Sequence, residues 1–192
     1  MKASFTASLP RLSPQSVVQI GLMAALTAVG AYLKIPLPHV PITLQMTFVG
    51  LAGIWLGPWR GAASQIIYLC VGLVGLPVFA KGGGPHYVFE PSFGFLLGFV
   101  PGALITGFIG RRTASYYGNL VAIYAGVIIV YAVGVPYFFF ILAVVLDAPL
   151  STEMTTGLVL LPLPKDLIVG LGTAFLAWRL QPVFDRGRRS PR

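Results

Sequence analysis

Long stretches without charged residues constrain the fold of this chain more than any other feature. Only 9% of its 192 residues are Asp, Glu, Lys or Arg. Six stretches, the last interrupted only by Lys165 and Asp166, are each near or above the roughly 20 residues that cross a bilayer as a helix. They are residues 12–33, 35–59, 61–80, 91–110, 113–146 and 154–178. The sequence therefore predicts an all-α membrane protein of one domain with six transmembrane helices, at about residues 16–33, 43–57, 61–80, 92–110, 119–146 and 155–179.

The basic residues fall mainly on one side of the membrane when the loops are numbered alternately. That side receives ten of the thirteen Lys and Arg residues: Lys2, Arg11, Arg60, Arg111, Arg112, Arg179, Arg186, Arg188, Arg189 and Arg192. The other side receives Lys34, Lys81 and Lys165, with four of the five acids, Glu90, Asp147, Glu153 and Asp166. Basic loops stay in the cytoplasm, so both termini are predicted to be cytoplasmic in a multi-pass protein of the cell membrane. Because the basic residues flank the spans, the net charge of +8 favours contact with anionic lipids over nucleic acid.

Lys165 and Asp166 are the strongest candidates for a functional site. An ionisable residue near the centre of a span costs about 2.5–3.5 kcal/mol on insertion scales, and it usually faces a cavity or a partner. Asp166 precedes Arg179 by 13 residues, which at ~1.5 Å per residue is about 20 Å of helix and lies within the membrane. The alternative is a place at the outer interface, with the lysine reaching to water. The position along the helix favours a cavity.

The predicted outer loop between the third and fourth helices contains Gly82, Gly83 and Gly84. Their backbone N–H groups could cradle an anion, with positive charge from Lys81 and His86, or the glycines could simply make the loop flexible. Aromatic residues around this loop could pack on a ring of a ligand: Phe79, Tyr87, Phe93 and Phe95. Together with the acid and the lysine of the sixth helix, the loop predicts a small pocket that opens to the outside.

The first helix carries a row of small residues, Gly21, Ala24, Ala25 and Ala28. Such a row lets another helix approach closely. That helix could belong to a partner protein or to this chain, and the spacing alone does not distinguish the two.

Patterns for catalysis and metal binding are weak. His39 and His86 are the only histidines, and no Cys/His cluster has ligand spacing, so neither a metal nor a cofactor is predicted. Ser92 shares the outer side with His86 and Asp166, but it lacks the surrounding pattern of a known nucleophile. No nucleotide-binding loop is present, so this chain by itself is not expected to drive transport by hydrolysis.

Three stretches, taken in order, resemble one family. They are residues 35–45 (Ile-Pro-Leu-Pro-His-Val-Pro-Ile-Thr-Leu-Gln), 73–84 (Leu-Val-Gly-Leu-Pro-Val-Phe-Ala-Lys-Gly-Gly-Gly) and 90–107 (Glu-Pro-Ser-Phe-Gly-Phe-Leu-Leu-Gly-Phe-Val-Pro-Gly-Ala-Leu-Ile-Thr-Gly). The chain resembles the biotin-specific S component, BioY, of energy-coupling factor (ECF) transporters over nearly its whole length.

The resemblance implies a subunit that captures biotin from outside and delivers it by toppling in the membrane. Its implied partners are a transmembrane T component and two ATPases, which use the ATP. Ala24 and Ala28 would dock against the T component. The loop at residues 35–42 would be a lid, which contains Pro36, Pro38, His39 and Pro41.

The sixth helix departs from the pattern of this family. Many members carry an aspartate near its start and a lysine three residues later. Asp166 matches the aspartate, but Val169 stands at the lysine position and Lys165 precedes the acid instead. Adjacent residues on a helix point about 100° apart, so we expect Lys165 to reach the site only where the turn at Pro164 is unwound.

The chemistry of biotin fits these residues. The N–H groups of its ureido ring would donate to Asp166 in charge-assisted hydrogen bonds, and its rings and chain would lie on apolar walls. Its carboxylate would accept from the glycine backbone or from a lysine. Two alternatives stay open, an S component for another small vitamin and an intramembrane enzyme that depends on Ser92 or His86.

Overall fold

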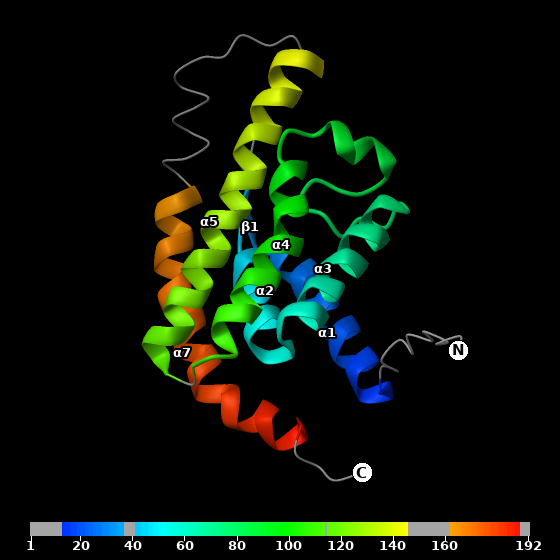
Figure 1. Cartoon of the computed structure of the whole chain (residues 1–192). Coiled ribbons are helices and arrows are strands. Elements are labelled where there is room, and N and C mark those ends of the chain that lie inside the picture. The colour runs from blue at the N-terminus through cyan, green and yellow to red at the C-terminus, as the bar shows by residue number, and fades with distance from the viewer. Residues whose placement is uncertain (1–12, 37–40, 114, 146–161, 189–192) are drawn as a thin grey trace, which may run out of the picture.

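The computed structural model describes residues 13–36, 41–113, 115–145 and 162–188. Within them it contains six α-helices, so the prediction of an all-α fold with six helices is confirmed (Figure 1). The helices are α1 (Pro14–Tyr32), α2 (Gln45–Leu56), α3 (Pro58–Leu73), α4 (Phe93–Gly110), α5 (Tyr116–Phe140) and α7 (Pro162–Arg188). A π-helical turn, η2 (Ile141–Val145), extends α5. Among the described residues, three segments are long and apolar enough to cross a membrane: α1, α4, and α5 with η2.

Glycine and proline residues explain where the helices differ from the predicted spans. The third span was expected to run to residue 80, but α3 ends at Leu73. It is followed by Gly75, whose φ of 119° is left-handed, and by Pro77, which disfavours the helical conformation in the residue before it. α7 starts with Pro162 in its first turn, where the missing N–H has no helical partner to lose. It continues past the predicted end to Arg188, with Pro182 inside it.

A short β-hairpin connects α1 to α2, where the sequence predicted only an irregular loop. Strands β1 (Lys34–Ile35) and β2 (Ile42–Thr43) are antiparallel, with Lys34 opposite Thr43. Two side chains bind the hairpin end of α1 to the loop between α3 and α4. The Tyr32 hydroxyl donates to the carbonyl of Pro77, and the Lys34 ammonium donates to the carbonyl of Ala80. The hairpin is therefore held over the same loop that the glycines occupy.

The helices pack closely where glycine replaces larger residues. Gly98 of α4 lies so near the backbone of Val130 in α5 that a Cβ at this position would come within 2.9 Å of it. A second close approach joins α2 to α4, where a Cβ at Gly53 would lie 2.7 Å from the carbonyl oxygen of Ala103. These contacts place α4 at the centre, between α2, α3 and α5.

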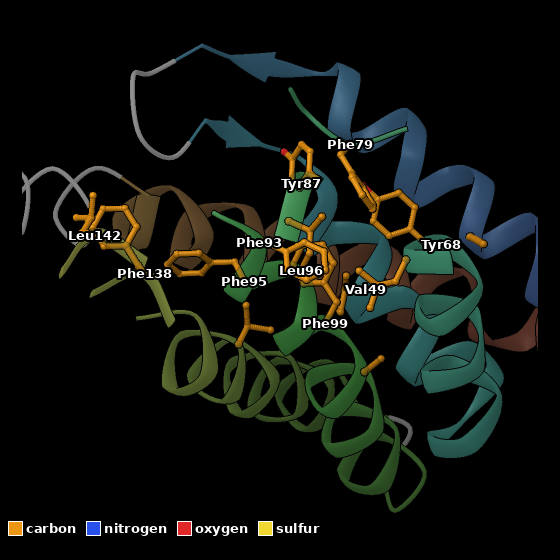
Figure 2. Packing of buried hydrophobic residues seen from close by; sticks show 14 residues of the cluster. Val49, Tyr68, Phe79, Tyr87, Phe93, Phe95, Leu96, Phe99, Phe138 and Leu142 are labelled. Atoms are coloured by element: carbon orange, nitrogen blue, oxygen red, sulfur yellow. The ribbon is translucent and has the colours of Figure 1, made fainter. Parts of the chain in front are cut away.

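An aromatic cluster anchors the α3–α4 loop to the helices. The loop contains a short 3-10 helix, η1 (Pro85–Phe89), which carries Tyr87. The ring of Phe79 lies 4.6 Å from that of Tyr87 and 5.4 Å from that of Tyr68, measured between ring centroids. Figure 2 shows these rings above Phe93, Leu96 and Phe99. The cluster fixes one wall of the pocket described below.

Candidate binding site

A partly open pocket lies where α2, α4, α5, α7, the hairpin and the α3–α4 loop meet. It encloses about 530 Å³ of space not filled by atoms, part of which is open to solvent. The lining residues are Pro41, Thr43, Gln45, Met46, Ala80, Tyr87, Ser92, Phe95, Leu96, Phe99, Val130, Tyr131, Pro162, Lys165 and Asp166. Most of the wall is apolar, with polar groups at a few positions.

Asp166 is the buried acid of this pocket, and its side chain is only 5% exposed. One carboxylate oxygen accepts a hydrogen bond from the Lys165 ammonium, and the other accepts from the Tyr131 hydroxyl at 2.8 Å. The charge is therefore paired and both oxygens are oriented. Each carboxylate oxygen can accept more than one hydrogen bond, so Asp166 retains acceptor capacity for a ligand. This geometry favours the cavity over the interface as the location of the pair.

Lys165 reaches the acid although the helix is regular there, so the expectation of an unwound turn is wrong. Residue 165 belongs to α7, which begins three residues earlier at Pro162. The lysine side chain is long and flexible, and it bends back to the carboxylate despite the offset between adjacent helix positions. Its ammonium also donates to the backbone carbonyl of Thr43 at 2.7 Å.

The glycines of the outer loop are not part of the pocket wall. The Gly82 amide donates to the carbonyl of Phe79 at 3.1 Å, and the Gly84 amide donates to the carbonyl of Gly72 at 2.7 Å. These two N–H groups are therefore already used within the loop and are not free to cradle an anion. Gly82 and Gly84 have φ of 124° and 113°, and a Cβ at Gly83 would overlap the carbonyl of Leu76. Backbone conformation and close approach account for all three glycines.

The other residues expected around that loop have different places. Tyr87 and Phe95 line the pocket, whereas Phe79 and Phe93 support them from the aromatic cluster. His86 is exposed and does not line the pocket. The Lys81 ammonium lies 3.0 Å from a carboxylate oxygen of Glu90, so it forms a salt bridge in the loop.

The sequence did not single out several polar residues of the pocket. Tyr131 is one of them, and its ring also packs edge-on against Phe95, with 5.4 Å between the centroids. Gln45 is another: its amide nitrogen donates to the Tyr68 hydroxyl at 2.7 Å, and its amide oxygen accepts from Thr43 at 2.9 Å. The available signal was a polar side chain inside or at the start of an apolar span.

The expected lid is described only at its edges. Pro41 lines the pocket and Pro36 is exposed, while Pro38 and His39 lie outside the described residues. The β-hairpin brackets this segment beside the pocket.

The row of small residues on α1 is split between two faces. Ala24 is 7% exposed and belongs to the aromatic cluster, against which Ala28 also packs. Gly21 and Ala25 are exposed. Ala24 therefore makes an internal helix contact, and the expected docking of Ala24 and Ala28 against a partner stays a prediction. The helical period places Ala24 and Ala25 on different faces.

These features define a helical membrane protein with a partly open, mostly apolar pocket that contains a buried acid. A sequence profile described as the BioY family matches residues 2–186. The chain belongs to the BioY family, which makes it a transporter protein rather than an enzyme.

Individual proteins show the same similarity. The chain is 46% identical over 184 residues to a protein of Lysinibacillus sphaericus named "Probable biotin transporter BioY", with 94% of this chain and 93% of that protein covered. It is 38% identical over 173 residues to the biotin transporter BioY of Rhodobacter capsulatus, covering 85% and 91% of the two chains. The crystal structure of the S-component for biotin from an ECF-type ABC transporter superposes with a TM-score of 0.75 at 26% identity, covering 90% of this chain and 95% of that one.

Proposed function

We propose that this chain is the biotin-binding S component of an ECF-type transporter, and that Asp166 is the residue that recognises the ligand. The observation that carries the proposal is a buried carboxylate on an otherwise mostly apolar pocket, oriented by Lys165 and Tyr131. The BioY family and the solved S-component for biotin support the choice of ligand.

The ureido ring of biotin matches this end of the pocket. One of its two N–H groups would donate to Asp166, and hydrogen bonds to a charged acceptor are about twice as strong as neutral ones. Its carbonyl oxygen would accept from Lys165 or Tyr131. The sulfur-containing ring and the aliphatic chain would lie on Phe95, Leu96 and the other apolar walls.

The proposed topology places all six helices in a prokaryotic plasma membrane with both termini in the cytoplasm. The distribution of basic residues supports this orientation. The pocket then opens to the outside, with the strands at residues 34–35 and 42–43 beside it. α2 has only 12 residues, or about 18 Å at ~1.5 Å per residue, so it depends on its neighbours within the bilayer.

The proposed partners are a transmembrane T component and ATPase subunits, which use ATP, together with the surrounding lipids. We place the docking contact on the exposed face of α1 that carries Gly21 and Ala25. A Cβ at Gly21 would meet nothing within 4 Å, so another backbone can approach this face closely.

A titration of the purified solitary subunit with biotin and with a panel of other labelled vitamins tests this function. We expect saturable binding of biotin and no binding of the others at the same concentration. Tight binding of another vitamin in place of biotin would make the chain an S component of different specificity.

A further inference from the structure

Two buried hydroxyl groups of the pocket lie beside each other, and neither makes a hydrogen bond of good geometry in the described part of the chain. They belong to Tyr87, which is 1% exposed, and to Ser92, which is 3% exposed. Both residues line the same pocket as Asp166. Buried polar groups in folded proteins are nearly always hydrogen-bonded, so two hydroxyls on one pocket that lack a well-formed bond are available to a ligand.

The Ser92 hydroxyl also makes no hydrogen bond within its own helix. Ser92 is the N-cap residue of α4, where a serine side chain ordinarily accepts a hydrogen bond from the first turn of the helix. This serine makes no such bond and has a backbone conformation in the helical region. Its hydroxyl is therefore not used to cap the helix.

The Tyr87 ring is held by its neighbours. It lies 4.6 Å from the ring of Phe79 and 6.2 Å from that of Phe93, measured between centroids. Figure 2 shows its oxygen on the side away from Phe79. Burial raises the pKa of Tyr87, and the Ser92 hydroxyl and the backbone of Lys81 lower it by smaller amounts. The side chain is therefore a neutral phenol that can donate a hydrogen bond, close to a second hydroxyl that can do the same.

The hydroxyl pair and Asp166 reach the pocket from different walls. Tyr87 lies on η1, which packs against α3 and α4, whereas Asp166 lies on α7, which packs against α5 and α2. In Figure 1, α4 and α5 stand between α7 and the α3–α4 loop. Phe95, Leu96 and Phe99 contribute apolar surface to the same pocket.

We infer that the hydroxyls of Tyr87 and Ser92 bind the carboxylate at the tail of the ligand, at the end of the pocket away from Asp166. This inference rests on the proposed function and assigns the two ends of biotin to the two polar groups. Two neutral donors suit a carboxylate, which only accepts hydrogen bonds. The start of α4 adds the positive end of a helix dipole. The amides of Gly82 and Gly84, which were the first candidates for this role, are already bonded.

The test compares biotin with its uncharged methyl ester in the parent protein and in the double variant Tyr87→Phe/Ser92→Ala. The parent should prefer biotin, and the double variant should bind biotin at least about 10-fold more weakly, the effect of losing a hydrogen bond to a charged group. The variant should bind the ester with nearly the parent affinity. Tyr117→Phe, at an exposed position outside the pocket, is the matched control and should change neither affinity.

Protein stability gives a second readout. Each substitution removes an oxygen that lacks a well-formed hydrogen bond, so the ligand-free double variant should melt at the same temperature as the parent or higher. The rise in melting temperature on adding biotin should shrink. A full preference for biotin over the ester in the double variant would overturn the assignment, as would loss of that preference in Lys165→Ala instead.

The outcomes also distinguish failure of the proposed biotin binding from failure of the carboxylate assignment alone. If the parent binds neither biotin nor the ester, the proposed function fails and the assignment fails with it. If the parent binds biotin and Asp166→Asn weakens that binding while the hydroxyls prove irrelevant, only the assignment of the carboxylate fails.

Discussion

The Lys165 ammonium donates a hydrogen bond of 2.7 Å to the backbone carbonyl oxygen of Thr43, a residue 122 positions away in the sequence. This bond joins the first turns of α7 to strand β2 of the hairpin. Because the same ammonium pairs with Asp166, the acid of the site and the hairpin beside the pocket share one cation. A ligand that accepts a hydrogen bond from Lys165 would therefore weaken the bond between Lys165 and the Thr43 carbonyl of the hairpin.

Replacing this lysine should loosen the hairpin. In Lys165→Met, we expect faster hydrogen exchange at the amide of Leu44, which donates to the carbonyls of Gly30 and Leu33 beside the strands. In Asp166→Asn the ammonium and its bond to Thr43 remain, so exchange at Leu44 should stay close to that of the parent. Equal exchange rates in the two variants would show that Lys165 does not hold the hairpin.

The two faces of α1 should respond differently to a large side chain. Ala25→Trp lies on the exposed face, so the solitary subunit should still bind biotin but fail to assemble with the T component. Ala24→Trp places the same side chain in the aromatic cluster, where overpacking typically costs about 1–3 kcal/mol or more and should lower the melting temperature. Normal assembly of Ala25→Trp would exclude this face as the docking surface.

The proposed orientation can be tested by labelling single cysteines. Cys70 is first replaced by alanine, because it is the only cysteine of the chain. A cysteine at the exposed His86 should react with an impermeant reagent from outside, and one at Arg112 should react only after the membrane is permeabilised. Gly83 is unsuitable because a Cβ there would overlap the Leu76 carbonyl. Reaction of position 86 only from the cytoplasmic side would reverse the proposed topology.

Much of the fold was predictable because it follows from apolar segments, charged boundaries and prolines. Lipid solvation forces backbone hydrogen bonds into helices, so long uncharged stretches translate directly into the six helices. The end of α3 at Leu73 was missed, since the apolar character of the chain continues to residue 80 while Gly75 and Pro77 end the helix. The β-hairpin was missed as well, because its two-residue strands are too short to show a pattern.

The candidate site could be predicted only in part from the sequence. A buried charge in an apolar span is costly, so Asp166 and Lys165 were visible in the sequence. Tyr131, Gln45 and Ser92 carry no charge, and only the packing of distant helices places them on the pocket. The triple glycine was misread because a backbone that adopts left-handed angles and one that binds an anion have the same composition.

The affinity of Asp166→Asn for biotin tests the central claim most directly. The substitution preserves shape but removes the charge that would accept a ureido N–H group, so binding should weaken by roughly 1.5–3 kcal/mol, or about 10- to 150-fold in Kd. Glu90→Gln is the matched control, because its carboxylate pairs with Lys81 outside the pocket, and it should leave Kd unchanged. Unchanged affinity for biotin in a folded Asp166→Asn protein, measured by the same titration, would contradict the assignment of Asp166 as the residue that recognises the ligand.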